Sequence, residues 1–263
     1  MFTDLVTMVV AGAAFAALFG AAGRRLHQSR PYGPLNVPGT ALAALTCGWL
    51  IVAACCETLS PQSGTSPPGP PIHGTVSLLV RDTVLLLWTL AVLVLWRGTG
   101  SVRRLFPRWE REFLTQTGLA VAGYVALRLT VVATYNCTLT LAAWLGYAGP
   151  TGHPTLEVIA ETENPYQRWV LIASVTLITP LLEEAMFRVA LVGWFQQHVS
   201  LIGAVFASAV IFALFHWPPV TQPAMMVMGI LMAWAYARTG SLYVPALMHA
   251  AFNLHSIVEV LTG

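Results

Sequence analysis

The sequence predicts an all-α fold, a polytopic transmembrane helix bundle with about eight spans. Charged residues make up only 9% of the 263 residues, whereas an ordinary soluble domain carries roughly 25%. Apolar residues make up 56% of the chain, and nine residues are Trp. Several runs of about 20 residues carry almost no charge, which is the length that a helix needs to cross a bilayer. The composition argues against a soluble enzyme, a nucleic-acid-binding protein and a secreted disulfide scaffold.

Apolar segments follow one another along the whole chain, each long enough or nearly long enough to cross about 30 Å as a helix. The fourth is longer than a membrane requires, and the sixth is short. Pro and Gly gather between segments, most densely over residues 61–74, which predicts a loop. The predicted spans are 5–23, 39–57, 75–96, 117–147, 168–192, 200–216, 222–238 and 241–261.

Basic residues indicate how the chain is oriented. All 13 are Arg, and the connections at 58–74 and 148–167 contain none of them. Because short cytoplasmic loops are enriched in basic residues, the two Arg-rich connections are expected to be cytoplasmic, with both termini on the opposite side. The arginines concerned are Arg24, Arg25 and Arg30 after the first span, and Arg97, Arg103, Arg104, Arg108 and Arg111 after the third.

The fifth segment contains Glu183, Glu184 and Arg188 in an otherwise apolar run. Each charge near the centre of a membrane helix costs roughly 2.5 to 3.5 kcal/mol, so three without partners would cost on the order of 8 to 10 kcal/mol. Glu184 and Arg188 lie four residues apart with the acid first, the order that favours an ion pair. Glu183 points about 100° away and is a candidate general base facing a cavity. A buried network that only fixes helix packing is the alternative.

Two later segments supply further polar side chains. His216 lies at the end of the sixth segment, and His249 and Asn253 project from one face of the eighth. Taken alone, His216 fits an interface residue, and the other two fit a clasp between membrane helices. Together with the two glutamates, they can supply a base, its orienting partner and two donors for an oxyanion.

The expected depths of these residues conflict in a regular bundle. Glu183 should lie nearer the cytoplasmic side and His216 nearer the opposite side, because spans five and six run in opposite directions. Either the predicted segment ends are displaced, or Pro218 and Pro219 end a short sixth helix within the bilayer. In the second case the following loop lies against protein around a wet cavity.

These residues form three short motifs in order on successive apolar segments. The pattern resembles the CAAX prenyl protease and bacteriocin-processing family, the Rce1-like and Abi-type intramembrane proteases, over residues 168–254. The stretch 240–245 is also similar to the sequence that usually precedes the last motif in that family. The motifs are EExxxR at Glu183, Glu184 and Arg188, FxxxH at Phe212 and His216, and HxxxN at His249 and Asn253.

The resemblance implies an endopeptidase whose site lies within the membrane. Glu183 would activate water with help from His216, while His249 and Asn253 would hold the oxyanion of the tetrahedral intermediate. Glu184 belongs to the implied site, which Arg188 and Phe212 would support. We expect one integral membrane domain, in which residues 1–160 form N-terminal spans with Arg-rich cytoplasmic loops and residues 161–263 form the catalytic core.

Three alternatives remain open from the residues alone. Glu183, His216 and His249 could bind zinc with an open fourth position, although the chain has no HExxH motif, and we expect no cofactor. A non-catalytic scaffold or immunity protein would keep the polar cluster for packing. A small proton-coupled transporter would use the buried carboxylates, but the chain shows no internal repeat of the kind typical of transporters.

The expected partners are the lipid bilayer and a membrane-associated protein or peptide substrate, with no nucleic acid. The Ala- and Leu-rich composition without Lys suggests the bacterial cytoplasmic membrane. CAAX processing, bacteriocin maturation and removal of C-terminal anchors all remain open. Arg81, Asp82 and Arg128 are expected to serve packing or to reach the interface, and Asp82 could pair with Arg128.

Overall fold

The computed structural model describes residues 1–27, 39–59, 72–97, 106, 112–216 and 218–263. Within these ranges the regular elements are helices, with no strand, so the all-α prediction is confirmed. Seven long helices match predicted spans to within a few residues. They are α1 (Phe2–His27), α2 (Gly39–Leu59), α3 (Ile72–Arg97), α5 (Phe113–Trp144), α10 (Leu201–Leu214), α11 (Gln222–Thr239) and α12 (Tyr243–Thr262).

The fifth predicted span is one continuous rod whose winding changes along its length. Two stretches of the rod are π-helical, with i to i+5 backbone hydrogen bonds, and they flank the short α-helical piece that carries both glutamates. Such stretches are frequent at functional sites. The rod comprises α7 (Pro165–Ala173), η1 (Ser174–Ile178), α8 (Thr179–Glu184), η2 (Ala185–Val192) and α9 (Gly193–Phe195), of which η1 and η2 are the π-helical stretches.

The chain is an integral membrane protein. Five stretches among the described residues are long and apolar enough to cross a membrane. α2 and α3 contain 21 and 26 residues, and the count of about eight spans stays a prediction. The five stretches are Phe2–Ala21, Phe113–Trp144, Pro165–Phe195, Pro219–Thr239 and Tyr243–Thr262.

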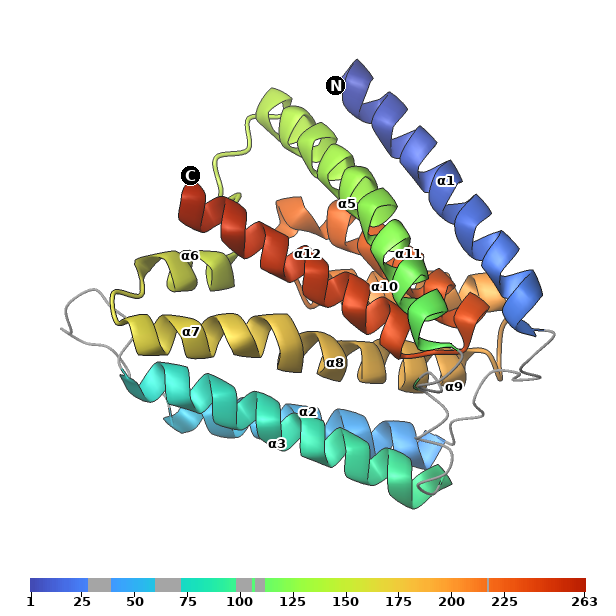
Figure 1. Cartoon of the computed structure of the whole chain (residues 1–263). Coiled ribbons are helices and arrows are strands. Elements are labelled where there is room, and N and C mark those ends of the chain that lie inside the picture. The colour runs from blue at the N-terminus through green and yellow to red at the C-terminus, as the bar shows by residue number, and fades with distance from the viewer. Residues whose placement is uncertain (28–38, 60–71, 98–105, 107–111, 217) are drawn as a thin grey trace.

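The rod from α7 to α9 runs through the middle of the molecule, between two groups of helices (Figure 1). The hairpin of α2 and α3 packs along one side, where α3 contacts α7, η1 and α8. On the other side α12 contacts η1 and α8, and α10 contacts η2. α1 packs on α5, and both contact α11. The rod, which carries Glu183, Glu184 and Arg188, is therefore enclosed by helices from both ends of the chain.

The sixth span is short and ends before the two prolines, as the second explanation of the depth conflict requires. The Ser200 hydroxyl caps the start of α10 by accepting a hydrogen bond from the Gly203 N–H at 3.2 Å. α10 has 14 residues, a length of about 21 Å. After Leu214 the chain passes through the 3-10 turn η3 (Pro219–Thr221) and enters α11.

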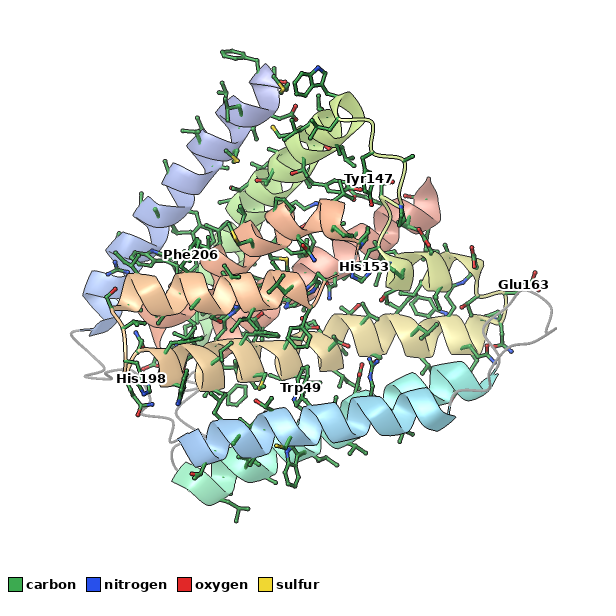
Figure 2. All side chains as sticks on the ribbon, turned by 180° about the vertical axis from the view of Figure 1, so that it is seen from behind. Trp49, Tyr147, His153, Glu163, His198 and Phe206 are labelled. Carbon is green, nitrogen blue, oxygen red and sulfur yellow. The ribbon has the colours of Figure 1, made fainter. Side chains whose placement is uncertain are left out.

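The connection at 148–167 contains a short helix that the sequence analysis did not predict. α6 (Pro154–Glu161) begins with Pro at its first position, where the missing N–H costs nothing. The Nδ1 atom of His153 caps it by accepting a hydrogen bond from the Thr155 N–H at 3.3 Å. Figure 2 shows the His153 side chain where the connection from α5 reaches α6.

The orientation prediction rests on residues that the structure does not describe. Five of its arginines lie outside the described residues, and the side chains of the other three are likewise not described. The cytoplasmic placement of both Arg-rich connections therefore stays a prediction, as does the division at residue 160. The five arginines are Arg30, Arg103, Arg104, Arg108 and Arg111, and the other three are Arg24, Arg25 and Arg97.

Candidate active site

Glu184 and Arg188 form the ion pair that their spacing predicts. The Arg188 Nε atom donates to Glu184 Oε2 at 2.8 Å, and Nη2 lies 3.4 Å from Oε1. Both side chains are 0% exposed. The guanidinium also lies 4.8 Å from the centroid of the Phe212 ring, where a cation–π contact stabilises it. Both oxygens of the Glu184 carboxylate thus contact the Arg188 guanidinium. This arrangement fits a supporting residue better than a residue that accepts and releases a proton.

Glu183 has a different environment from its neighbour. Its side chain is 19% exposed, yet the Oε2 atom is buried and makes no hydrogen bond within the described residues. The nearest basic atom recorded for it is His249 Nε2, at 3.8 Å. A buried carboxylate oxygen without a partner is costly and is available to a ligand. The two neighbouring glutamates thus have different surroundings, although both lie near the His249 ring.

His249 lies between the two carboxylates. Its Nδ1 atom is 3.1 Å from Glu184 Oε1, and its Nε2 atom faces Glu183. Because Glu184 is held as a carboxylate by Arg188 and can only accept, Nδ1 carries a hydrogen and donates it. The ring of His249, which lies in α12, is buried. Its hydrogen bond to Glu184, which Arg188 holds in place, fixes the orientation of the ring.

His216 follows the end of α10 with one ring nitrogen occupied. Its Nδ1 atom lies 2.7 Å from the Phe212 carbonyl oxygen. A carbonyl oxygen only accepts hydrogen bonds, so Nδ1 carries the hydrogen and Nε2 of the neutral ring is an acceptor. The spacing of four residues between Phe212 and His216 in the motif allows this hydrogen bond, which closes the last turn of α10.

Asn253 compensates a defect that Pro180 introduces in the rod. The Thr179 N–H bonds to the Ser174 carbonyl in the π-helical turn η1, and Pro180 has no N–H. The Val175 carbonyl therefore lacks both the i+4 and the i+5 donor of its own helix. Asn253 Nδ2 donates to it at 2.9 Å. The second N–H of the same amide is not used by this bond.

Four of the predicted residues line one cavity of about 790 Å³: Glu183, His216, His249 and Asn253. Glu184, Arg188 and Phe212 are buried beside them and are not part of its lining. The structure thus brings the three motifs together, with one set of side chains at the cavity and another supporting it. Much of the remaining wall is apolar, including Phe187, Phe215, Met225, Met228 and Phe252.

Residues before the fifth span also line the cavity, and the sequence analysis missed one of them. His153, in the cap of α6, lies with its ring 6.2 Å from that of His216. Burial lowers the pKa of His153 below its usual value of 6.5. The signal that could have revealed it is the His-Pro pair at the start of α6.

Asp82 and Arg128 line the cavity but do not pair, so the suggested contact between them is wrong. Arg128 instead contacts Glu259 and donates to Ser256 Oγ at 3.0 Å. Asp82 accepts hydrogen bonds from the rod, and its ion-pair partner is the adjacent Arg81. The role expected for Asp82, packing or a reach to the interface, is taken up again below.

Over the described part of the chain, no three His, Cys, Asp or Glu residues are grouped closely enough to hold a metal ion. Glu183, His216 and His249 nevertheless line the same cavity. The zinc alternative is therefore tested separately below.

Residues 165–255 match the family model described as type II CAAX prenyl endopeptidase Rce1-like. The match identifies this region, about a third of the chain, as Rce1-like. It runs from the start of α7 into α12 and contains the seven predicted site residues, so the resemblance is confirmed. Members are intramembrane peptide-bond hydrolases, and the chain is accordingly an intramembrane protease of the CAAX type. No curated protein and no solved structure matches the chain.

Proposed function

We propose that the chain is a glutamic-type intramembrane endopeptidase in which Glu183 is the general base. One observation carries the assignment. Glu183 Oε2 is a buried carboxylate oxygen with no hydrogen-bond partner in the described residues, in a side chain that lines the cavity. Glu184, the other acid of the motif, is held by Arg188 and His249, which leaves Glu183 as the carboxylate able to take a proton.

The hydrolytic water binds between two acceptors. One O–H points to the Glu183 carboxylate and the other to His216 Nε2, whose Nδ1–H is given to the Phe212 carbonyl. The oxygen lone pair is then directed at the scissile carbonyl carbon. Glu183 takes the proton as the C–O bond forms, and later delivers it to the leaving amine as the C–N bond breaks.

His249 and Asn253 stabilise the oxyanion of the tetrahedral intermediate. For His249 Nε2 to donate, the ring must carry both hydrogens and be positively charged. Arg188 balances one of the two glutamates, and the imidazolium balances the other, so the buried cluster is neutral before attack. When the proton moves to Glu183 and charge develops on the oxyanion, the cluster stays neutral, which avoids an uncompensated charge in a site of low dielectric.

Asn253 contributes its second amide hydrogen to the same oxyanion. Its first hydrogen is donated to the Val175 carbonyl at 2.9 Å, so the amide is already oriented before substrate binds. A donor that is held in advance costs no reorganisation in the transition state. The bond to the rod therefore supports the proposed role of Asn253 at the reacting carbonyl.

The substrate is a membrane-associated protein or peptide, and its apolar part lies along the aromatic and Met side chains of the cavity wall. We place the enzyme in a bacterial cytoplasmic membrane, with residues 1–160 as N-terminal spans and 161–263 as the catalytic core. Comparison of membrane proteomes from cells with the native chain and with Glu183→Ala would identify substrates, as proteins that accumulate uncut in the variant.

The decisive variant is Glu183→Gln, which keeps the size of the side chain and removes the base. An internally quenched peptide ending in a farnesylated Cys-aliphatic-aliphatic-Met sequence serves as the probe for the purified full chain. We expect kcat to fall about 10²- to 10⁴-fold, the usual contribution of a general base. Glu163→Gln is the matched control, because Glu163 is an exposed acid outside the cavity. Native kcat in Glu183→Gln would remove the proposal.

The zinc alternative has its own test. The purified chain is treated with a chelator, and cleavage of the same peptide is followed before and after Zn²⁺ is restored. Activity that is unchanged by chelation supports direct attack by water. Activity that is lost with the chelator and returns with Zn²⁺ would replace the glutamic mechanism by a metal-dependent one.

A further inference from the structure

Asp82 is a buried acid of α3, outside the Rce1-like region, that reaches the catalytic rod. Its side chain is 5% exposed. One oxygen, Oδ2, accepts hydrogen bonds from Ser174 Oγ at 3.1 Å and from Thr179 Oγ1 at 2.9 Å. The other, Oδ1, accepts from Arg81 Nε at 2.8 Å. The carboxylate is thus satisfied by one cation and by two hydroxyls of the rod.

The two hydroxyls lie at the two ends of the π-helical turn η1. Ser174 and Thr179 are five residues apart, and on a regular α-helix such a pair points about 140° apart. In a π turn the i to i+5 hydrogen bond brings the two residues one above the other. That bond, from the Thr179 N–H to the Ser174 carbonyl, is present. A single oxygen can therefore bond both hydroxyls in the π form and cannot do so in the α form.

The winding of this turn determines where Glu183 points. A π turn holds one more residue than an α turn, so its relaxation to α-helix would rotate the following residues by about 100° relative to α7. Glu183 lies four residues after Thr179, at the end of α8. The same turn presents the Val175 carbonyl to Asn253. Both proposed catalytic side chains thus depend on the π form.

We propose that Asp82 is a positioning residue of the protease site, which holds the turn Ser174–Ile178 in its π-helical form and thereby directs Glu183 into the cavity. The inference rests on the proposed role of Glu183. In this proposal the hairpin of α2 and α3 contributes to the reaction, although Asp82 itself does not touch the reacting atoms. Packing alone would not require one carboxylate oxygen to bind both ends of the turn.

The chain offers a closely matched pair of variants. Thr179→Val removes a hydroxyl that bonds Asp82. Thr176→Val makes the same change within the same turn, at a buried hydroxyl that has no hydrogen-bond partner among the described residues. Thr176 is also not part of the cavity lining. Asp82→Asn is the third variant, since it keeps the size of the side chain and removes its charge.

Kinetics of the purified full chain on the farnesylated quenched peptide give the first test. We expect kcat to fall about 10-fold in Thr179→Val and up to about 100-fold in Asp82→Asn, the scale of a small misplacement of a catalytic group. KM should stay within about threefold, and Thr176→Val should stay within twofold of the native kcat. The double variant Asp82→Asn/Thr179→Val should be no slower than Asp82→Asn, because the two changes remove one interaction.

Amide hydrogen exchange gives a second test that needs no substrate. Peptides covering residues 174–183 should exchange faster in Asp82→Asn and Thr179→Val, and at the native rate in Thr176→Val. Native exchange and native kcat in Thr179→Val would overturn the proposal, as would an equal loss of kcat in Thr176→Val. If Asp82→Asn does not fold, the two Thr variants decide alone.

The failure of this inference and that of the proposed function are distinguishable. If Glu183→Gln keeps native kcat, the glutamic mechanism fails, whatever the exchange data show for the turn. If Glu183→Gln is inactive while Thr179→Val and Asp82→Asn keep native kcat and native exchange, the mechanism stands and Asp82 has no positioning role.

Discussion

Removal of Arg188 should destabilise the protein far more than removal of a partly exposed arginine of the same bundle. Arg188→Met keeps the length of the side chain but leaves Glu184, which is 0% exposed, as a buried carboxylate without its cation. Breaking a buried pair in this way costs about 3 to 5 kcal/mol. The variant also loses the cation–π contact with Phe212, worth about 0.5 to 2 kcal/mol, while the Glu184–His249 contact offsets part of the loss.

The assay is equilibrium unfolding of the purified chain in mixed micelles, followed by far-UV circular dichroism as denaturing detergent is added. Arg128→Met is the control, because its partner Glu259 is 54% exposed, and loss of such a pair costs about 1 kcal/mol or less. Arg128 also lies 5.0 Å from the centroid of the Phe252 ring, so both variants lose a cation–π contact and the comparison isolates the ion pair. The double variant Glu184→Gln/Arg188→Met should recover at least 1 kcal/mol relative to the sum of the single variants. The reasoning fails if Arg188→Met is no less stable than Arg128→Met.

Two further predictions concern packing and pH. Gly229→Ala should destabilise the protein in the same unfolding assay by about 1 to 3 kcal/mol, because a Cβ at Gly229 would lie 3.0 Å from the Ala209 backbone. Gly118→Ala is the control, since a Cβ there meets open space, and it should be neutral or slightly stabilising. Equal effects of the two variants would contradict the close approach of α10 and α11. Burial lowers the pKa of His153 in the folded chain below 6.5. Below pH 6.5 the unfolded chain therefore binds more protons than the folded chain does. The free energy of unfolding should consequently fall as the pH falls from 6.5 toward 5. His153→Gln should flatten this slope in detergent unfolding between pH 5 and 8, and an unchanged slope would show that another group is responsible.

The helices were predictable because their signal is local. Apolar runs of membrane length, bounded by Pro and Gly, locate the long helices to within a few residues, as for α11. Helix periodicity also separated Glu183 from Glu184, since the pairing of Glu184 with Arg188 depends only on the spacing of four residues. The chemistry of three motifs far apart in the sequence suggests one site, and the family resemblance supplies the role of each residue in it.

The remaining features depend on contacts that no single segment encodes. The π turn at Ser174 exists in a tertiary context, with Asp82 on one side and Asn253 on the other, so periodicity alone predicted plain α-helix there. The sequence predicts only packing or a reach to the interface for Asp82, because its two partners on the rod, Ser174 and Thr179, lie more than 90 positions away in the chain. His153 lies in a polar connection without apolar periodicity, a pattern that predicts a loop, although Pro154 begins a helix there.

The short α10 has a consequence for the surrounding lipid. A helix of 14 residues covers about 21 Å of a hydrocarbon layer that is about 30 Å thick, and its outer side chains Ile202, Phe206 and Leu214 are exposed. We expect the deficit of about 9 Å to be met in part by thinning of the bilayer around α10. Such thinning would draw headgroups and water inward at the end where His216 lies, and the water consumed in hydrolysis would then have less hydrocarbon to cross. The rate of cleavage would in that case depend on membrane thickness as well as on the substrate.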